Sequence, residues 1–173
     1  MAIDVFPTLA ELIGARQSAQ PTERKIDGAS FRDLLFGRRG AGAPHEALFF
    51  YSGDELQAVR SERWKLHFPH RYLTVNGPPG RDGKPANFGS LQPANIGLTG
   101  IDGIATRHGY RVESLELSLF DLRADPGERR NVAAAHPEVV RRLTELAVPM
   151  RGELGDSLTG AKGRGLRPPG RSQ

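Results

Sequence analysis

Hydrophobic residues recur at helical spacing near both ends of the chain. Apolar side chains at every third or fourth position predict a helix over residues 4–13, with Asp4 as its N-cap and Gly14 just beyond its end. A second apolar stripe predicts a helix over residues 137–148, which Pro149 is expected to end or kink. Because that stripe is continuous, the second helix must bury it against another element.

Short apolar runs and strict alternation predict strands between these helices. The predicted strands cover residues 47–51, 56–60, 64–68 and 115–122. In the third strand, Trp64, Leu66 and Phe68 share one face. Lys65 and His67 share the other face. This alternation indicates that one face of the sheet packs on a core and that the other face looks outward.

The order of the elements predicts an α+β fold. Its main part is a small antiparallel four-stranded sheet packed against the C-terminal helix, and a helical segment precedes the sheet. Within that segment, Ser30 can cap a short helix over residues 31–36. Residues 61–63 have the length of a hairpin turn. Residues 76–103 are rich in glycine and proline without a period, so we expect an irregular loop over residues 73–116.

Charge is distributed unevenly along the 173 residues. The chain has 24 basic and 20 acidic side chains, a net charge of +4. Residues 157–173 hold four of the basic side chains and no acidic one, so the rest of the chain is neutral. A basic face for nucleic acid is therefore not predicted. Residues 155–173 are predicted to be a disordered basic tail.

Composition excludes several other classes of protein. The chain has no cysteine, which excludes disulfides, thiolate metal sites and a cysteine nucleophile. No apolar run approaches the roughly 18 residues of a membrane helix. The first residues carry acids and lack a basic region before the apolar stretch, so they do not predict a secretory signal.

Two histidines form the most interesting local cluster. His67 and His70 lie three residues apart around a proline, but no third metal ligand follows at a suitable spacing. Two interpretations stay open: the imidazoles line a cleft that binds an anion, or they are surface histidines. His45, His108 and His136 are interpreted as structural or solvated. No nucleophile elbow, phosphate-binding loop or other catalytic motif is present, so no catalytic residue is assigned.

Several segments together resemble the C-terminal part of type I sulfatases, the arylsulfatase group. In order along the chain they read IDVFPTLAELIGA, DGASFRDLLFG, ELQAVRSERWKLHFPHRY and LFDLRADPGERRNVAAAHPEVVRRL. The most specific are a VRxxxWKLH pattern and a DPxExxN pattern, which contains Asp125 and Asn131. The resemblance implies an alkaline-phosphatase-like fold, in which a small C-terminal domain packs an antiparallel sheet against a helix. The helix over residues 4–13 would be the last helix of a large α/β catalytic domain.

The family's chemistry is sulfate ester hydrolysis by a formylglycine, made from the cysteine or serine of a C/S-x-P-x-R motif, with a calcium ion. Neither that motif nor the metal-binding aspartate pairs occur in this chain. The resemblance therefore implies a C-terminal sulfatase fragment that is inactive alone, because the formylglycine motif and the metal ligands are absent, and whose partner is the missing N-terminal domain. The expected divisions are a remnant of the large domain over residues 1–37, a C-terminal subdomain over 38–154 and the tail over 155–173.

The resemblance also suggests roles for individual residues. His67 and His70 occupy a stretch that can reach the rim of the substrate pocket in the family, and Lys65 shares the outward face with His67. These three are the expected contacts to a sulfate ester substrate. Asp125 and Asn131 are interpreted as structural residues of a turn. Relatives often have glycine at the position of Glu62.

A function of another class remains as an alternative. The chain could be a stand-alone module that binds polyanions or sulfated glycans through residues 76–103 and the basic tail. No nucleic acid and no membrane is expected as a partner. Many relatives are periplasmic or secreted, but the sequence assigns no location to this chain.

Overall fold

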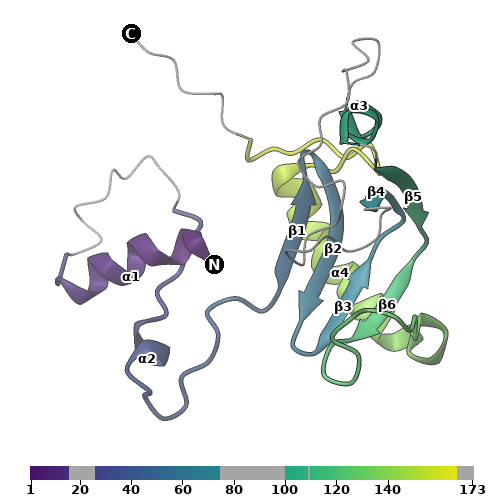
Figure 1. Cartoon of the computed structure of the whole chain (residues 1–173). Helices are drawn as coiled ribbons and strands as arrows, with labels where there is room; N and C mark the ends of the chain where they lie inside the picture. The colour runs from purple at the N-terminus through teal and green to yellow at the C-terminus, as the bar shows by residue number, and fades with distance from the viewer. Residues whose placement is uncertain (16–25, 75–99, 109, 167–173) are drawn as a thin grey trace, which may run out of the picture. The chain divides into compact units, whose positions relative to one another are not determined.

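The computed structural model of the chain describes residues 1–15, 26–74, 100–108 and 110–166 (Figure 1). The chain divides into two compact units, Met1–Leu48 and Phe49–Gln173. We call them the N-terminal unit and the sheet unit and describe each by itself. None of the helices in the described part is long and apolar enough to cross a membrane.

The N-terminal unit contains two helices. A short 3-10 turn, η1 (Ala2–Asp4), leads into α1 (Val5–Leu12), and α2 (Arg32–Leu35) follows. The predicted helix over residues 4–13 is thus confirmed, and Gly14 follows it with a φ of +70°. Asp4 occupies the N-cap position, but its side chain does not cap α1. Its carboxylate turns instead toward the amide of Ala29 and the imidazole of His45.

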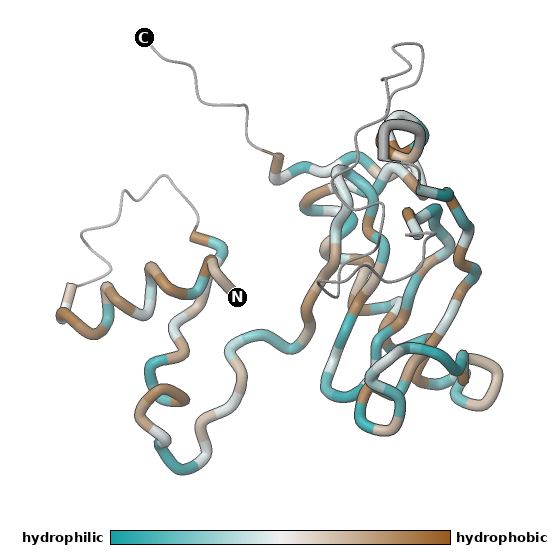
Figure 2. The backbone as a smooth tube through the Cα atoms, in the orientation of Figure 1, coloured by the Kyte–Doolittle hydropathy of each residue, from teal (hydrophilic) through white to brown (hydrophobic). Residues whose placement is uncertain are grey.

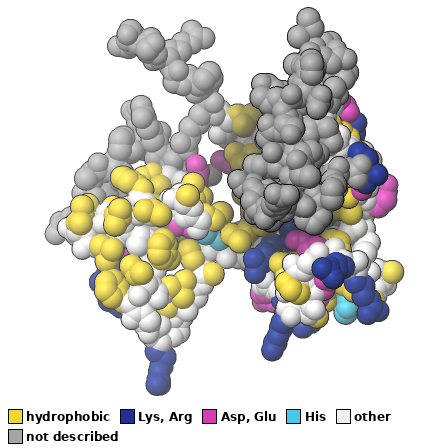
Figure 3. Space-filling view, in the orientation of Figure 1, with side chains coloured by type: hydrophobic (Ala, Val, Ile, Leu, Met, Phe, Trp, Pro, Cys, Tyr) yellow, Lys and Arg dark blue, Asp and Glu magenta, His cyan; other side chains and the backbone are white. Residues whose placement is uncertain are grey.

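Helix α1 is packed with its polar side inward. Its side chains that are buried in this unit belong to Asp4, at the N-cap, and Thr8. Its apolar residues are exposed: Phe6 to 61% and Ile13 to 80%. Hydrophobic residues recur along the α1 tube in Figure 2, and Figure 3 shows hydrophobic side chains gathered over the unit that contains α1 and α2.

The sheet unit is built on the predicted four-stranded sheet. Its strands are β1 (Leu48–Ser52), β2 (Glu55–Ser61), β3 (Trp64–His67) and β6 (Ser118–Asp121), in the order β1-β2-β3-β6. Antiparallel pairing of β3 places Leu66 opposite Val59 on one side and Leu119 on the other. In the β2–β3 turn Glu62 has a φ of +54°, a conformation that glycine adopts at lower cost.

Helix α4 (Pro137–Leu154) covers one face of this sheet (Figure 1). The core between them is fully buried at Val59, Leu66, Leu119 and Leu143. Pro149 was predicted to end or kink the helix; it does not end it, because α4 continues to Leu154. Pro149 and Glu145 are both exposed, so the carbonyl that loses its amide partner can be hydrated.

Three further elements lie where an irregular loop was predicted or next to it. They are β4 (His70–Thr74), α3 (Gly100–His108) and β5 (Arg111–Leu115). β4 and β5 form a separate antiparallel hairpin, with Tyr72 opposite Glu113. The predicted strand over residues 115–122 is in fact divided, since Leu115 ends β5 and β6 begins at Ser118. The remainder of the predicted loop, residues 75–99, lies outside the described residues.

The segment after α4 also differs from the prediction of a disordered tail. Asp156 pairs with Ala161 in an isolated bridge, and the amide of Ser157 donates to the carbonyl of Asp54. The first part of the predicted tail, up to residue 166, therefore has a defined place against the strands. Residues 167–173 lie outside the part of the chain that is described.

Candidate functional site

The three predicted site residues lie close together on β3 and β4. Lys65 and His67 alternate with the core residues of β3, so they stand on the sheet face that is turned away from α4. Their side chains are 17% and 15% exposed, so only a small part of each can contact another molecule. His70 is buried and begins β4, directly after Pro69 in the short link from β3.

A single carboxylate, Glu128, joins the first two of these residues. One of its oxygens lies 2.7 Å from Nζ of Lys65, and the other lies 2.7 Å from Nε2 of His67. We call Lys65, His67 and Glu128 the carboxylate cluster. Glu128 has a φ of +52°, which a non-glycine residue adopts only at some cost. The surrounding turn therefore has to hold it.

Asp125 and Asn131 hold that turn, as predicted. The carboxylate of Asp125 accepts hydrogen bonds from the amides of Arg129 and Arg130 at 2.7 and 2.8 Å. The side-chain oxygen of Asn131 accepts from the amide of Leu119 in β6, and its nitrogen donates to a carbonyl of the same segment. The DPxExxN pattern thus fastens the turn to the strand beside β3, which brings Glu128 to Lys65 and His67.

His70 belongs to the same neighbourhood but not to the carboxylate cluster. Its Nδ1 lies 2.7 Å from the carbonyl oxygen of Phe68, so the proton of this ring sits on Nδ1 when the ring is neutral. The rings of His67 and His70 stack with 5.6 Å between centroids. The ring of Phe120 also contacts that of His67, nearly perpendicular to it, with 5.7 Å between centroids.

Opposing influences set the charges of the carboxylate cluster. Burial lowers the pKa of His67 below its ordinary value of 6.5, and this outweighs the opposite effect of Glu128. Burial acts to raise the pKa of Glu128, but its contacts with Lys65 and His67 outweigh this and hold it below 4.5. At neutral pH, His67 is therefore uncharged and donates Nε2–H to Glu128. Its Nδ1 is buried and has no hydrogen-bond partner among the described residues.

These shifts predict that acid destabilises the sheet unit. Because the pKa of His67 is lower in the folded chain than in the unfolded chain, the unfolded chain binds more protons as the pH falls below about 6.5. The stabilisation by ionised Glu128 is lost at still lower pH, as the pH falls through its folded pKa. We expect the urea midpoint, followed by the fluorescence of Trp64, to fall between pH 7 and pH 5.

The matched variant is His67→Gln, which keeps a donor toward Glu128 but cannot titrate. We expect its midpoint to depend less on pH over this range than that of the wild type. His136→Gln serves as the control because His136 is more exposed, at 38% of its side chain. An unchanged pH dependence in His67→Gln would show that His67 does not carry the effect.

The carboxylate cluster suits binding better than covalent chemistry. It combines one ammonium, one carboxylate and one neutral imidazole, and the hydroxyl opposite His67 in β6, that of Ser118, already donates to the carbonyl of Glu116. Among the described residues, no group of three or more histidine, cysteine or acidic side chains could hold a metal ion. Glu128 was missed from the sequence, although the DPxExxN pattern marks it, because its partners lie more than 60 residues away.

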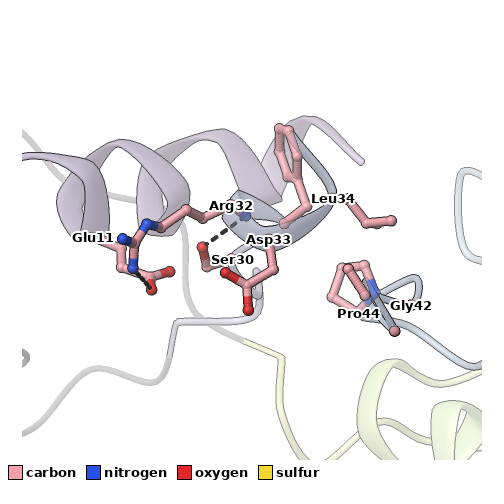
Figure 4. A pocket seen from close by; sticks show the side chains of 10 residues that line it. Glu11, Ser30, Arg32, Asp33, Leu34, Gly42 and Pro44 are labelled. Atoms are coloured by element: carbon pink, nitrogen blue, oxygen red, sulfur yellow. Dashed lines mark hydrogen bonds and ion pairs between the residues drawn. The ribbon is translucent and has the colours of Figure 1, made fainter. Parts of the chain in front are cut away.

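A pocket of about 300 Å³ lies in the N-terminal unit, away from the predicted residues (Figure 4). Its charged groups are already paired: Arg32 contacts Glu11 of α1 at 3.0 Å, and Asp33 contacts Arg38, which does not line the pocket, at 3.0 Å. The hydrogen bonds from Ser30 and Arg32 lower the pKa of Glu11. Since these charges are satisfied internally, the pocket suggests no particular ligand.

Comparison with known proteins agrees with the fold. A family model described as the C-terminal region of aryl-sulfatase matches residues 43–159. Mouse steryl-sulfatase is 34% identical over 156 residues, which is 88% of this chain and 22% of that protein. Human arylsulfatase D is 35% identical over 134 residues, 74% of this chain and 19% of that protein. The chain thus spans about a fifth of the length of these relatives.

A solved structure shows the same architecture. The PsFucS1 sulfatase from Pseudoalteromonas sp. superposes with a TM-score of 0.56 and 16% sequence identity, over 85% of this chain and 24% of that one. At this identity the match concerns the fold alone. The family model covers most of the chain and the curated relatives agree with it, which confirms the resemblance drawn from the sequence motifs. The chain therefore belongs to the arylsulfatase family and contains the C-terminal region of that family.

Proposed function

We propose that this chain serves as the C-terminal subdomain of a sulfuric ester hydrolase, resting against a large catalytic domain, and that these 173 residues do not hydrolyse sulfate esters by themselves. The relatives carry the names steryl-sulfatase and arylsulfatase, and the chain corresponds to about a fifth of their length. Hydrolysis of a sulfate ester is accordingly the activity that we propose for the complete enzyme.

The inverted packing of α1 is the observation that carries this proposal. A helix of a water-soluble unit normally turns its apolar side inward, whereas α1 turns its polar side inward. Phe6, Leu9 and Ile13 are each more than half exposed, and Leu35 at the end of α2 and the following Phe36 are exposed as well. Covering one such side chain contributes about 1.5–3 kcal/mol, so this surface favours a large apolar partner.

The catalytic groups of the family have no counterpart in the sequence motifs of this chain or among its described residues. The chain contains no cysteine and no C/S-x-P-x-R motif, so it has no site at which a formylglycine could form. The described residues likewise do not fit the family's calcium ion, since none of their clusters could hold a metal. We therefore assign the nucleophile and the calcium ion to the catalytic domain and derive no step through them.

In the complete enzyme, the proposed part of Lys65, His67 and His70 is to contact the substrate at the rim of its pocket. The position of Lys65 and His67 supports this role, because both stand on the face of the four-stranded sheet that is turned away from α4, and the ring of His70 stacks on that of His67. Glu128 would act through Lys65 and His67 as a positioning residue, since it fixes both side chains at 2.7 Å. A flexible ammonium held in this way loses less entropy when it meets a sulfate oxygen.

The proposal predicts an uncovered apolar surface and no activity. The purified chain is expected to increase the fluorescence of the dye ANS and to release no nitrophenol from 4-nitrophenyl sulfate in the presence of calcium. Replacing Phe6 and Ile13 together by serine is expected to lower the dye signal about twofold, because both side chains lie on the exposed stripe.

A matched control uses the sheet unit. Val148 and Leu166 are exposed to 61% and 64%, close to the values for Phe6 and Ile13 but outside the stripe on α1. Replacing them by serine is expected to leave the dye signal nearly unchanged. An equal loss in both double variants would contradict a docking surface on α1. Turnover of the aryl sulfate above the no-protein rate would contradict the proposed inactivity.

A further inference from the structure

Five exposed arginines gather at one end of the four-stranded sheet. Two come from the region of the β2–β3 turn, and three come from the segment that follows β6. We call them the arginine end: Arg60, Arg63, Arg123, Arg129 and Arg130. Figure 3 shows dark-blue side chains projecting from this end of the sheet unit. No local pattern marks the arginine end in the sequence, because its members come from two segments about 60 residues apart.

Backbone hydrogen bonds bring the two segments together. The amide of Leu122, next to Arg123, donates to the carbonyl of Arg63 at 2.8 Å. The chain then folds back on itself, as the amide of Asp125 donates to the carbonyl of Asp121 at 2.7 Å. Asp125 in turn fixes the amides of Arg129 and Arg130. The arginines are therefore displayed by a turn with a fixed backbone.

The charge at this end is positive in an otherwise neutral fold. Outside residues 157–173 the chain carries 20 basic and 20 acidic side chains. The two segments of the arginine end, residues 60–63 and 121–130, contain five arginines and the three acidic residues Glu62, Asp121 and Asp125, once Glu128, which pairs with Lys65, is set aside. Asp125 is committed to backbone amides, and Asp121 lies 3.6 Å from Arg63. The end keeps a net positive charge.

We propose that the arginine end binds an extended polyanion that carries sulfate groups, such as a sulfated glycan chain. All five cations are arginines, whose planar forks match the oxygen pairs of sulfate better than a lysine ammonium does. Several such contacts along one chain add to each other without a deep pocket. This site is separate from the carboxylate cluster and requires no hydrolysis.

A nucleic acid fits this surface less well. Binding of single strands uses exposed aromatic side chains on which bases stack. Trp64, the aromatic residue that begins β3 next to this turn, is buried, and Arg63 lies over its ring at 4.6 Å. Among the described residues of the arginine end there is no helix that could enter a major groove.

The test measures binding of a fluorescent heparin-derived decasaccharide to the full chain at several salt concentrations. The triple variant Arg123→Gln, Arg129→Gln and Arg130→Gln is expected to lose on the order of tenfold in affinity and to depend less steeply on salt. An unsulfated heparosan chain of equal length is expected to bind the wild type at least about tenfold more weakly, since it lacks the sulfate groups.

The control variant makes the same change in net charge elsewhere. It replaces arginines that are each paired with a carboxylate, namely Arg38, Arg71 and Arg141. We expect its affinity to stay within about twofold of the wild type. A second control replaces the four basic residues of segment 157–173 by glutamine. Equal losses in either control and in the arginine-end variant would overturn the proposed site.

Two further results would overturn the choice of ligand. If heparosan bound as tightly as the decasaccharide, sulfate recognition would be refuted. If a DNA duplex of equal charge bound as tightly, the surface would be a general polyanion site. Because these measurements read binding to the chain itself, they are independent of whether the complete enzyme hydrolyses sulfate esters.

Discussion

Replacing Asp156 by alanine is expected to lower the free energy of unfolding of the sheet unit by about 3–5 kcal/mol. The side chain of Asp156 is fully buried just after α4 and serves three partners. One oxygen accepts from the amides of Leu56 and Leu158, each at 3.1 Å. The other oxygen accepts from Nε of Arg151 at 2.8 Å. Alanine would leave the buried Leu56 amide and a largely buried guanidinium without this partner.

The position of Asp156 explains why the loss of one carboxylate is expected to cost so much stability. Leu56 lies in β2 and Arg151 in the last turn of α4, so the side chain ties the helix to the sheet it covers. Arg151 also lies over the ring of Phe68 at 4.2 Å, and Tyr51 of β1 donates to the carbonyl of Gly155 at 2.9 Å. Loss of the carboxylate would loosen the packing of α4 on the strands.

Two further variants separate the effect of charge from that of hydrogen bonding. Asp156→Asn keeps an oxygen for the amides of Leu56 and Leu158, so we expect it to cost about 1–3 kcal/mol. Arg151→Gln leaves the buried carboxylate without its cation and is expected to fall between the two. Urea unfolding followed by Trp64, the single tryptophan, reports on this unit. An Asp156→Ala cost below about 1 kcal/mol would contradict the role we assign.

The alternation of side chains was sufficient to predict the sheet and its covering helix. Trp64 and Leu66 do face α4, and Lys65 and His67 face away, because strand periodicity is a local property of the sequence. The hairpin of β4 and β5 was not predicted. Its strands are joined by a connection of more than 30 residues and pair with each other, so no short turn marks them.

Contacts between distant segments were the part that the sequence could not reveal. Asp4 was predicted as an N-cap, which is its commonest role before a helix, yet its carboxylate meets His45, 41 residues away. Glu128 lies in a turn that was correctly interpreted, yet its own side chain went unassigned. In both cases a local rule explains where the backbone goes, but the partner is chosen by tertiary packing.

Replacing Asp4 by alanine is expected to unfold much of the N-terminal unit while the sheet unit stays intact. Among the described residues of this unit no large apolar side chain is fully buried, so polar contacts hold it together. The carboxylate of Asp4 accepts from the amide of Ala29 at 2.9 Å and contacts Nε2 of His45 at 2.7 Å. The hydroxyl of Thr8 donates to the Asp4 carbonyl and accepts from the amide of Phe31.

The packing of the segment that carries Ala29 depends on this contact. A Cβ on Gly28 would collide with the carbonyl of Ile3, so the backbone runs directly against the start of α1. Burial acts to raise the pKa of Asp4, but its contacts with the amino group of Met1, with His45 and with Ala29 outweigh this and hold it well below 3.8. This stabilisation is present above pH 3.8 and is lost as the pH falls through the folded pKa.

Amide hydrogen exchange measures the effect at Ala29 and Phe31 directly. A loss of about 3 kcal/mol corresponds to roughly a hundredfold faster exchange in Asp4→Ala. His45→Ala removes one partner but keeps the bond from Ala29, so we expect only about a tenfold increase. The urea midpoint of the sheet unit, followed by the fluorescence of Trp64, is expected to be unchanged in both variants. If Asp4→Ala left exchange at Ala29 at the wild-type rate, the N-terminal unit would have to be held by something other than this carboxylate, and the inverted packing of α1 would need another explanation.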